Sequence, residues 1–377
     1  MSCSRRSLLK GLALLASAAS REASAGGELV FGHIGAHSGV QANTGIDLRN
    51  GISLYFDFVN ANGGVKGQRL VLEAIDDEYK PEKTVEAARK LEANQKVIAL
   101  LATLGTENND ALIKSGLLAQ TGLINFGPRA AAGVLEASKE TYRVRASYAA
   151  EMRKIIAHAM TVGATRLALV SQGDGLGREG EKALLAVLAD HPEQLVARAS
   201  YERTTSDVSK AVATIRNSQA QAVIFVGISK ACAAFVSQYR AQGGGAVIYA
   251  ISVVDPAAVA KEAGGAKVHG LVVAQTMPSP RKVSMPLVRE LIQAVAATGH
   301  QVNLDYTTVE GYVVAKAAVE ILRKSSRLDR EGFRKTLASE SREMDLGGLV
   351  LNFSGGKRDG GDYVELSVIG PDGKVRN

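Results

Sequence analysis

A glycine-rich run near the middle of the chain is the pattern that most directly suggests chemistry. Residues 175–180 spell Gly-x-Gly-x-x-Gly between a predicted strand and a predicted helix, and Glu202 follows them. This order is typical of dinucleotide sites, where the glycines admit a pyrophosphate and the acidic residue binds a ribose hydroxyl. In such sites the first glycine ends the strand, whereas this strand is predicted to end near Ser171. A nucleotide-dependent oxidoreductase is therefore only a distant alternative.

Two histidines, His33 and His37, are the next candidates for chemistry. They lie in a predicted strand and loop, where a spacing of four does not bring side chains together as it does on a helix. No cysteine or nearby acidic pattern completes a tetrahedral metal site. The sequence also lacks a Gly-x-Ser-x-Gly elbow, a His-Glu-x-x-His helix and a Walker loop. We therefore predict that the protein is not an enzyme, and that it has no catalytic residue, bound metal or cofactor.

The elements that must position these residues alternate between short β-branched runs and amphipathic stretches. The predicted strands are 29–34, 69–76, 97–102, 123–126, 166–171, 194–201, 222–226, 247–250, 269–274, 349–353 and 363–369. The predicted helices are 45–60, 81–94, 108–120, 176–190, 207–218, 229–241, 255–263, 285–298 and 307–324. Two such series predict two α/β lobes, each with a doubly wound parallel sheet.

This fold class also predicts where a ligand binds. Ligands of open α/β sheets lie beyond the carboxyl ends of the strands, where loops and helix N-termini present free N–H groups. The segments in that position are 33–44, 103–108, 126–132, 172–177, 227–230 and 251–255. In a molecule with two lobes these segments face each other across a cleft, so the cleft is the predicted site.

The first 25 residues are interpreted as an export signal rather than as part of the fold. Basic residues at Arg5-Arg6 precede a short apolar run, and small residues end at Ala25. Such a segment is typical of a cleavable signal peptide, and its apolar run is too short to span a bilayer. Arg5-Arg6 followed by Ser-Leu-Leu-Lys resembles a twin-arginine signal, although a general secretion signal stays open. Either route predicts an exported protein that is cleaved near Ala25.

Composition and charge exclude several other classes of protein. The chain has 377 residues, 46% apolar and 22% charged, which is ordinary for a globular protein. Removing the signal takes away four basic residues and one acidic residue, so the net charge falls from +7 to +4. The basic residues are scattered among acidic ones, which argues against nucleic-acid binding. Cys232, the one cysteine left, is predicted to be a small core residue.

Four motifs occur in order along the mature chain. They are Gly35-Ala36-His37-Ser38-Gly39, Asn60-x-x-Gly63-Gly64-Val65-x-Gly67, Ile75-Asp76-Asp77 with Pro81, and Phe126-Gly127-Pro128-Arg129-Ala130. At this spacing the chain resembles the periplasmic solute-binding proteins of the leucine/isoleucine/valine-binding class, which serve ABC importers. The resemblance covers essentially the whole mature chain. It implies the type I periplasmic binding fold, with two lobes joined by a three-segment hinge.

The resemblance also implies how the chain is divided between the lobes. Lobe 1 is expected to comprise residues 28–145 and 277–345. Lobe 2 is expected to comprise residues 146–276 and 346–377. The three crossings between them are expected near residues 145–147, 275–278 and 344–348.

Several positions of this chain match the part of the family's site that holds a ligand carboxylate. Thr106 matches a hydroxyl residue at the tip of the third strand, and Pro128, Arg129 and Ala131 match the loop after the next strand. Arg129 adds a positive charge that the family's loop lacks, and the planar N–H donors of its guanidinium group suit a carboxylate. The alternative is that Arg129 points to solvent or pairs with an acidic residue on the lobe surface.

Other positions depart from the family's pattern. Ser252 falls where the family has the acidic residue that binds a ligand ammonium, and Ile228 falls where it has a tyrosine. Thr44 and Leu176 replace two aromatic residues, and Tyr79 and Gly105 replace two paired cysteines. A desolvated ammonium needs an anionic partner. We therefore expect a small organic acid or amino-acid-like solute, without a required ammonium group.

Four further residues complete the predicted site. Tyr148, at the first crossing, could close over the ligand or pack against the hinge. His37 is a polar candidate in the first cleft loop, and Ser229 would belong to the opposite lobe. Tyr306 could form a wall of the cleft or belong to the core.

The resemblance implies a function without covalent chemistry. The two lobes would close on the solute by a hinge, and the closed form would dock on the membrane permease of an ABC importer. The expected location is periplasmic. A ligand-sensing receptor subunit of the same fold is the alternative.

Overall fold

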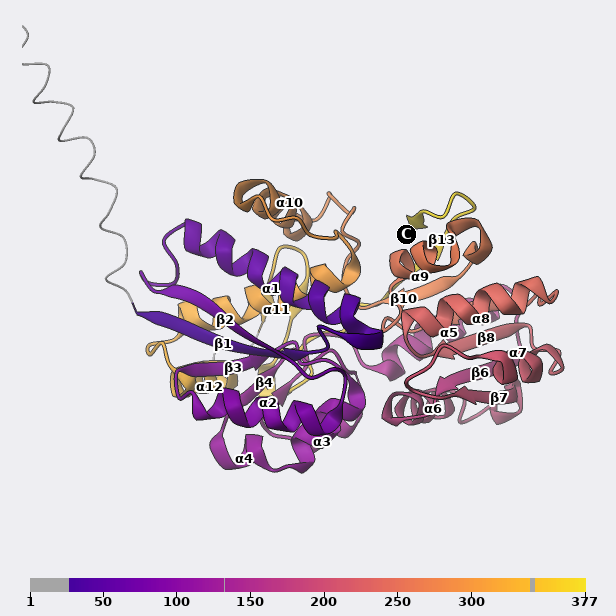
Figure 1. Ribbon diagram of the computed structural model, residues 1–377, viewed down its shortest axis with the longest axis horizontal. Helices are drawn as coiled ribbons and strands as arrows, with labels where there is room; N and C mark the ends of the chain where they lie inside the picture. Colours follow the sequence, from indigo (N-terminus) through magenta and orange to yellow (C-terminus); the bar gives the residue numbers. More distant parts are fainter. Residues whose placement is uncertain (1–26, 132, 340–342) are drawn as a thin grey trace, which may run out of the picture.

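The computed structural model describes residues 27–131, 133–339 and 343–377, so the predicted export signal lies outside the described residues. Two α/β lobes lie side by side along the long axis of the molecule (Figure 1). Each lobe has a mainly parallel sheet covered by helices on both faces, which confirms the predicted fold class. In the described segments, no helix has the length and apolar character needed to cross a bilayer.

Lobe 1 contains a five-stranded parallel sheet in the order β2-β1-β3-β4-β5. Its strands are β1 (Glu28–Gly35), β2 (Arg69–Asp76), β3 (Val97–Leu101), β4 (Ile124–Phe126) and β5 (Thr141–Tyr142). Its helices are α1 (Ala42–Ala61), α2 (Pro81–Ala93), α3 (Thr106–Lys114), α4 (Leu117–Thr121), α10 (Pro286–Thr298), α11 (Tyr306–Lys324) and α12 (Arg330–Ser339). The central strand β3 is buried at every residue, because helices cover both faces of a parallel sheet.

Lobe 2 contains a seven-stranded sheet in the order β14-β13-β10-β9-β8-β6-β7. Its strands are β6 (Leu167–Gln172), β7 (Leu195–Tyr201), β8 (Ala222–Val226), β9 (Val247–Ala250), β10 (Val272–Gln275), β13 (Glu365–Ile369) and β14 (Val375–Arg376). Its helices are α5 (Tyr148–Thr161), α6 (Gly175–Val187), α7 (Ser209–Arg216), α8 (Ser229–Ala241) and α9 (Pro256–Ala263). Cys232 lies fully buried in the core of this lobe, as predicted.

Three helical regions differ from the expectation. The helix expected over 108–120 is two helices, α3 and α4, because Gly116 between them adopts a left-handed conformation (φ +73°). Helix α5 was not expected, since its start lies at a predicted crossing. Its first turn is capped by Ser147, whose hydroxyl accepts a hydrogen bond from the Ala150 N–H. Helix α12 was not expected either, because few of its residues are apolar.

The C-terminal segment differs from the expected division into lobes. Strands β11 (Met344–Asp345) and β12 (Val350–Leu351) form a separate antiparallel pair, and Leu351 and Phe353 pack in the core of lobe 1. The Phe353 ring lies 6.0 Å from the Phe126 ring, centroid to centroid. The chain joins the lobe 2 sheet only at β13. The crossing expected near 344–348 therefore lies between residues 353 and 365, and residues 346–353 belong to lobe 1.

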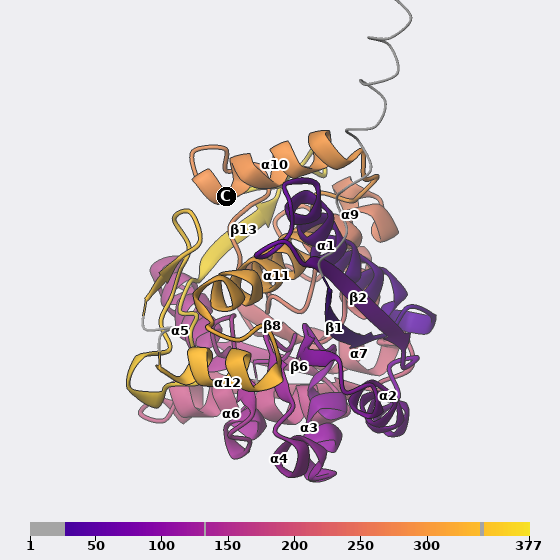
Figure 2. The same cartoon turned by 90° about the vertical axis from the view of Figure 1, so that its left-hand side faces the viewer.

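Two glycines bring helices α1 and α11 of lobe 1 almost into backbone contact (Figures 1 and 2). A Cβ atom on Gly51 would lie 2.2 Å from the carbonyl oxygen of Thr308. A Cβ atom on Gly311 would lie 2.2 Å from the carbonyl oxygen of Leu48. This packing holds α1 against the start of α11, so that Asp47 of α1 and the cap residue Asp305 both lie at the cavity between the lobes.

We expect Gly311→Ala to destabilise the protein by about 1–3 kcal/mol, because the added methyl group meets backbone atoms that cannot move without separating the helices. Urea unfolding and thermal melting measure the loss. Gly245→Ala is the control, because its Cβ would have no neighbour within 4 Å. Equal stability of the two variants would contradict this account of the helix packing.

Candidate functional site

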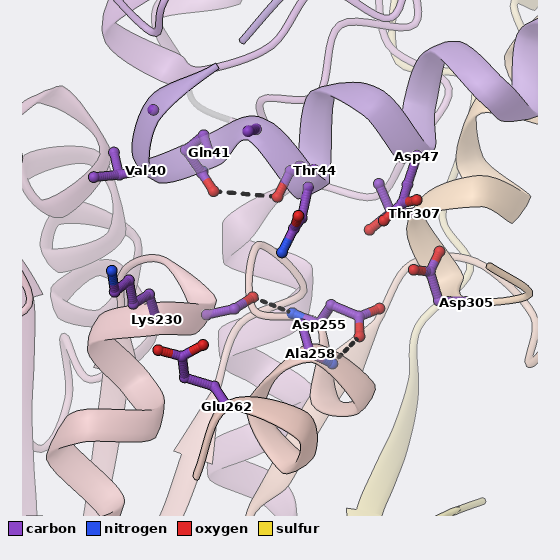
Figure 3. Close-up of a pocket in the computed structure, with 14 residues that line it drawn as sticks. Val40, Gln41, Thr44, Asp47, Lys230, Asp255, Ala258, Glu262, Asp305 and Thr307 are labelled. Atoms are coloured by element: carbon purple, nitrogen blue, oxygen red, sulfur yellow. Dashed lines mark hydrogen bonds between the residues drawn. The ribbon is translucent and has the colours of Figure 1, made fainter. Parts of the chain in front are cut away.

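A cavity of about 200 Å³ lies between the two lobes (Figure 3). It is lined from lobe 1 by residues 39–44, Asp47, Asp305 and Thr307, and from lobe 2 by Ser229, Lys230, Asp255, Ala258 and Glu262. This is room for several water molecules or for one small solute. Of the predicted site residues, Thr44 and Ser229 line this cavity, one from each lobe.

Helix starts carry the polar groups of this cavity. Asp305 caps α11 by accepting a hydrogen bond from the Thr308 N–H at 2.8 Å. Asp255 caps α9 by accepting one from the Ala258 N–H, also at 2.8 Å. The hydroxyl oxygen of Ser229 accepts a hydrogen bond from the Asp255 N–H at 2.9 Å. Aspartate is a favoured N-cap, so local helix chemistry places both carboxyl groups at the lobe junction.

Three aspartates of the cavity, Asp47, Asp255 and Asp305, have pKa values above the usual one for a carboxyl group. Burial, with the nearby Asp305 carboxylate, raises the pKa of Asp255 to about 6. Burial, with the Asp47 carboxylate, raises the pKa of Asp305 to about 7. The Asp47 side chain accepts a hydrogen bond from Asn303 at 3.1 Å and shares one with Asp305. Near neutral pH these three carboxyl groups are therefore not all fully ionised, and Asp305 is partly protonated.

A cluster of buried charges joins the lobes beside the cavity. The Arg129 guanidinium donates hydrogen bonds to the Glu310 carboxylate and, at 3.2 Å, to the Ser252 carbonyl oxygen. The Arg145 guanidinium donates to the Ser252 hydroxyl and lies 3.4 Å from Glu310. Ser252 donates from its N–H and its hydroxyl to Glu151, at 2.7 and 2.8 Å. All five residues are at most 5% exposed.

The two arginines and two glutamates of this cluster balance one another in charge. A buried charge that loses its partner costs about 3–5 kcal/mol. Arg129 therefore neither points to solvent nor pairs with an acidic residue on the lobe surface. Its guanidinium is already paired with Glu310, so a ligand carboxylate would have to compete with that pair.

Two other predicted residues meet across the lobes. The hydroxyl groups of Thr106 in α3 and Tyr148 in α5 lie 3.2 Å apart. Burial raises the pKa of Tyr148 to about 12, so its hydroxyl stays protonated. The Tyr148 N–H donates to the Ala131 carbonyl oxygen at 3.2 Å, and both residues line a second cavity of about 190 Å³.

The remaining predicted residues are not among those that line these two cavities. Leu176 and Ile228 are buried in the core of lobe 2. Tyr306 is buried in the core of lobe 1, with its hydroxyl donating to Asn377 at 2.8 Å. Pro128 is buried in the loop after β4. Gly105 precedes α3 at φ +99°, a conformation that glycine tolerates best.

The prediction that His33 and His37 stay apart was wrong. Their ring centroids lie 5.4 Å apart, because the chain turns directly after β1 and folds His37 back toward the strand. His33 donates from Nδ1 to the Leu101 carbonyl oxygen at 3.0 Å, and burial lowers its pKa to about 4. Within residues 27–131, 133–339 and 343–377, no three histidine, cysteine or acidic side chains form a group suited to a metal ion.

The Gly-x-Gly-x-x-Gly run lies inside helix α6 rather than at a strand-to-helix turn. Strand β6 ends at Gln172, and Asp174 caps the helix. The Gly175 N–H donates to the carboxylate of Glu107 from lobe 1, so a protein side chain already occupies this helix start. Gly180 lets α6 pack closely on Val226 of β8. These glycines therefore serve packing and lobe contact, and the geometry differs from a dinucleotide fingerprint.

Sequence reasoning missed a further contact between the lobes, which we call the Arg203 latch. The Arg203 guanidinium of lobe 2 lies 4.0 Å from the centroid of the Tyr79 ring and donates to Asn108 Oδ1 at 2.8 Å, both in lobe 1. Its Nε lies 2.8 Å from the Asp174 carboxylate. The one sequence feature that could have pointed to this contact is Tyr79, which occupies a position where the family that the sequence resembles has a cysteine.

Comparison with known proteins agrees with this architecture. A substrate-binding periplasmic protein from Ralstonia solanacearum is 37% identical, with 92% of this chain and 99% of that chain covered and a TM-score of 0.88. A possible leucine/isoleucine/valine-binding protein from Rhodopirellula baltica is 26% identical, with 93% and 95% covered and a TM-score of 0.87.

A curated relative gives a shorter match. It is an amino acid binding protein of Pseudomonas aeruginosa, 25% identical over 219 residues, which are 57% of this chain and 58% of that protein. The sequence model described as periplasmic binding protein matches residues 28–357. With the two lobes and the cavity between them, this match shows that the chain belongs to the periplasmic binding protein family.

Proposed function

We propose that this protein is the exported solute-binding component of an ABC importer, and that it traps a small organic acid or amino-acid-like solute between its lobes. The observation that carries the proposal is a cavity of solute size lined from both lobes. The names of the relatives support the choice of solute, and the composition of residues 1–25 supports export to the periplasm. The partner would be the membrane permease of the importer.

The proposed mechanism is closure without covalent change. A solute shifts a hinge equilibrium only through contacts that are better in the closed state. The cavity offers such contacts, because its two walls belong to different lobes. Protein contacts that join the lobes directly add to them, among them Arg203 with Asn108, Thr106 with Tyr148, and Arg129 with Ser252. The closed form would then present a fixed surface to the permease.

The first test is a thermal-shift screen against amino acids, aliphatic acids, aromatic acids, amides and ureas. We expect members of one class to raise the melting temperature, because they bind the folded state and not the unfolded chain. Small-angle scattering should show a smaller radius of gyration with the same solute, and mass spectrometry should recover it unchanged. Conversion of the solute, or binding without compaction, would contradict the proposed mechanism.

The Arg203 latch gives a second test. We expect Arg203→Ala to weaken binding of the solute found in the screen by about 10-fold or more, because closure loses a charged hydrogen bond and a cation–π contact. Calorimetry measures the affinity. Arg198→Ala is the matched control, since Arg198 also lies in the β7 region but pairs with Glu181 inside lobe 2. Equal affinities of the two variants would show that the latch does not contribute to closure.

A further inference from the structure

The cavity between the lobes is lined mainly by carboxyl groups. Asp47, Asp255, Asp305 and Glu262 face it, and one cationic side chain, Lys230, is among the described residues of the lining. Lys230 and Glu262 are exposed at the rim, whereas Asp47 and Asp255 are buried. Among the described lining residues, the inner part of the cavity therefore has acidic side chains and no cation, and the nearest buried cation, Arg129, is already paired with Glu310.

We propose that Asp255, together with Asp47 and Asp305 from the other lobe, binds a cationic ammonium group of the solute. The inference rests on the proposed function and names the chemical class of the solute more closely: an amine or an amino-acid-like compound, rather than a simple organic acid. It also places the binding of the ammonium group away from Ser252, whose hydroxyl and N–H are already bonded to Glu151.

One oxygen of Asp255 points to a ligand independently of the acidic cluster. Asp255 is 6% exposed, and its Oδ1 accepts the capping hydrogen bond of Ala258. Its other oxygen, Oδ2, is buried and has no hydrogen-bond partner in the described part of the chain. Figure 3 shows this side chain reaching from α9 toward Asp305 on the opposite wall. An unpaired buried acceptor costs free energy that a bound donor would recover.

The position of the carboxyl groups links this cation to closure. Asp255 belongs to lobe 2, while Asp47 and Asp305 belong to lobe 1. Closing the lobes without a solute brings like charges together in a place with little water, which is unfavourable. A cation between them is attracted to both lobes at once, so it favours the closed state specifically.

The chemistry of the site favours an organic ammonium over a metal ion. In the described segments no cluster of three histidine, cysteine or acidic side chains has the arrangement that a metal ion needs. An ammonium group instead brings three N–H donors, which suit carboxylate oxygens spread over two walls. The cavity also has room for the carbon skeleton that such a group would carry.

The test compares butylammonium, butyrate and butyramide, which share a skeleton of four carbons and differ in charge. We expect butylammonium at millimolar concentration to raise the melting temperature, and the other two to leave it unchanged. Asp255→Asn should abolish the shift while keeping the helix cap, because asparagine caps as well as aspartate. Asp207→Asn, which alters an exposed aspartate bonded to the Ser209 N–H in the same lobe, should keep the shift.

A second variant and a pH series keep the test independent of folding. Asp305→Asn should also weaken binding of the cation by at least 10-fold, even if Asp255→Asn folds poorly. Wild type should bind butylammonium more tightly at pH 8 than at pH 6, since protons on Asp305 and Asp255 must leave before the cation binds. The charged groups that face Asp255 are Asp47 on α1, Asp305 at the start of α11, Glu262 on α9, Lys230 on α8 and Arg129 after β4.

Several outcomes would overturn the inference without touching the proposed function. Stabilisation by calcium or sodium chloride that Asp255→Asn removes would assign the site to an inorganic cation. A solute from the screen that compacts the protein and binds Asp255→Asn as tightly as wild type would place its recognition elsewhere. Conversely, a shift by butylammonium that depends on Asp255, without compaction by any solute, would support the cation site and contradict the trapping mechanism.

Discussion

Pairing of buried charge is the constraint on which the junction between the lobes depends. Charged groups lose water when the lobes meet, and each one left without a partner costs several kcal/mol. Arg129 and Arg145 are paired there with Glu310 and Glu151, and Ser252 supplies further hydrogen bonds. Among the described residues that line the neighbouring cavity, the one cation is Lys230, which is exposed at the rim. Protein side chains thus balance the charge of the buried cluster. In our proposal, the solute balances the charge of the cavity.

The fold brings these groups together through the starts of helices. Asp255 and Asp305 each cap a helix, and α1 carries Asp47 one turn into its length. The glycine contact between α1 and α11 holds Asp47 against Asp305. Local capping and close helix packing therefore set the electrostatics of the cavity. A residue that looks like an ordinary helix cap in the sequence can for this reason also serve a ligand.

Local pattern in the sequence was enough to predict most of the fold. The strands expected at 69–76 and 222–226 and the helix expected at 229–241 coincide with β2, β8 and α8, because apolar periodicity is a property of neighbouring residues. Contacts between residues that are far apart in the sequence could not be predicted in this way. The sequence does not show that Phe353 meets the Phe126 ring, so the third crossing was misplaced. It also does not show that Glu310 pairs with Arg129, 181 residues away.

The candidate site shows the same limit for chemistry. Reasoning from one matched position, Ser252, predicts that the solute needs no ammonium group, because that position lacks a carboxylate. The structure places a carboxylate three residues later in the same loop, at Asp255, and orients it into the cavity. A binding group can move along a loop and still reach the same space, since the cavity is defined by both lobes and not by one position. In our proposal, charge in the assembled cavity is therefore the better guide to the solute than residue identity at one aligned site.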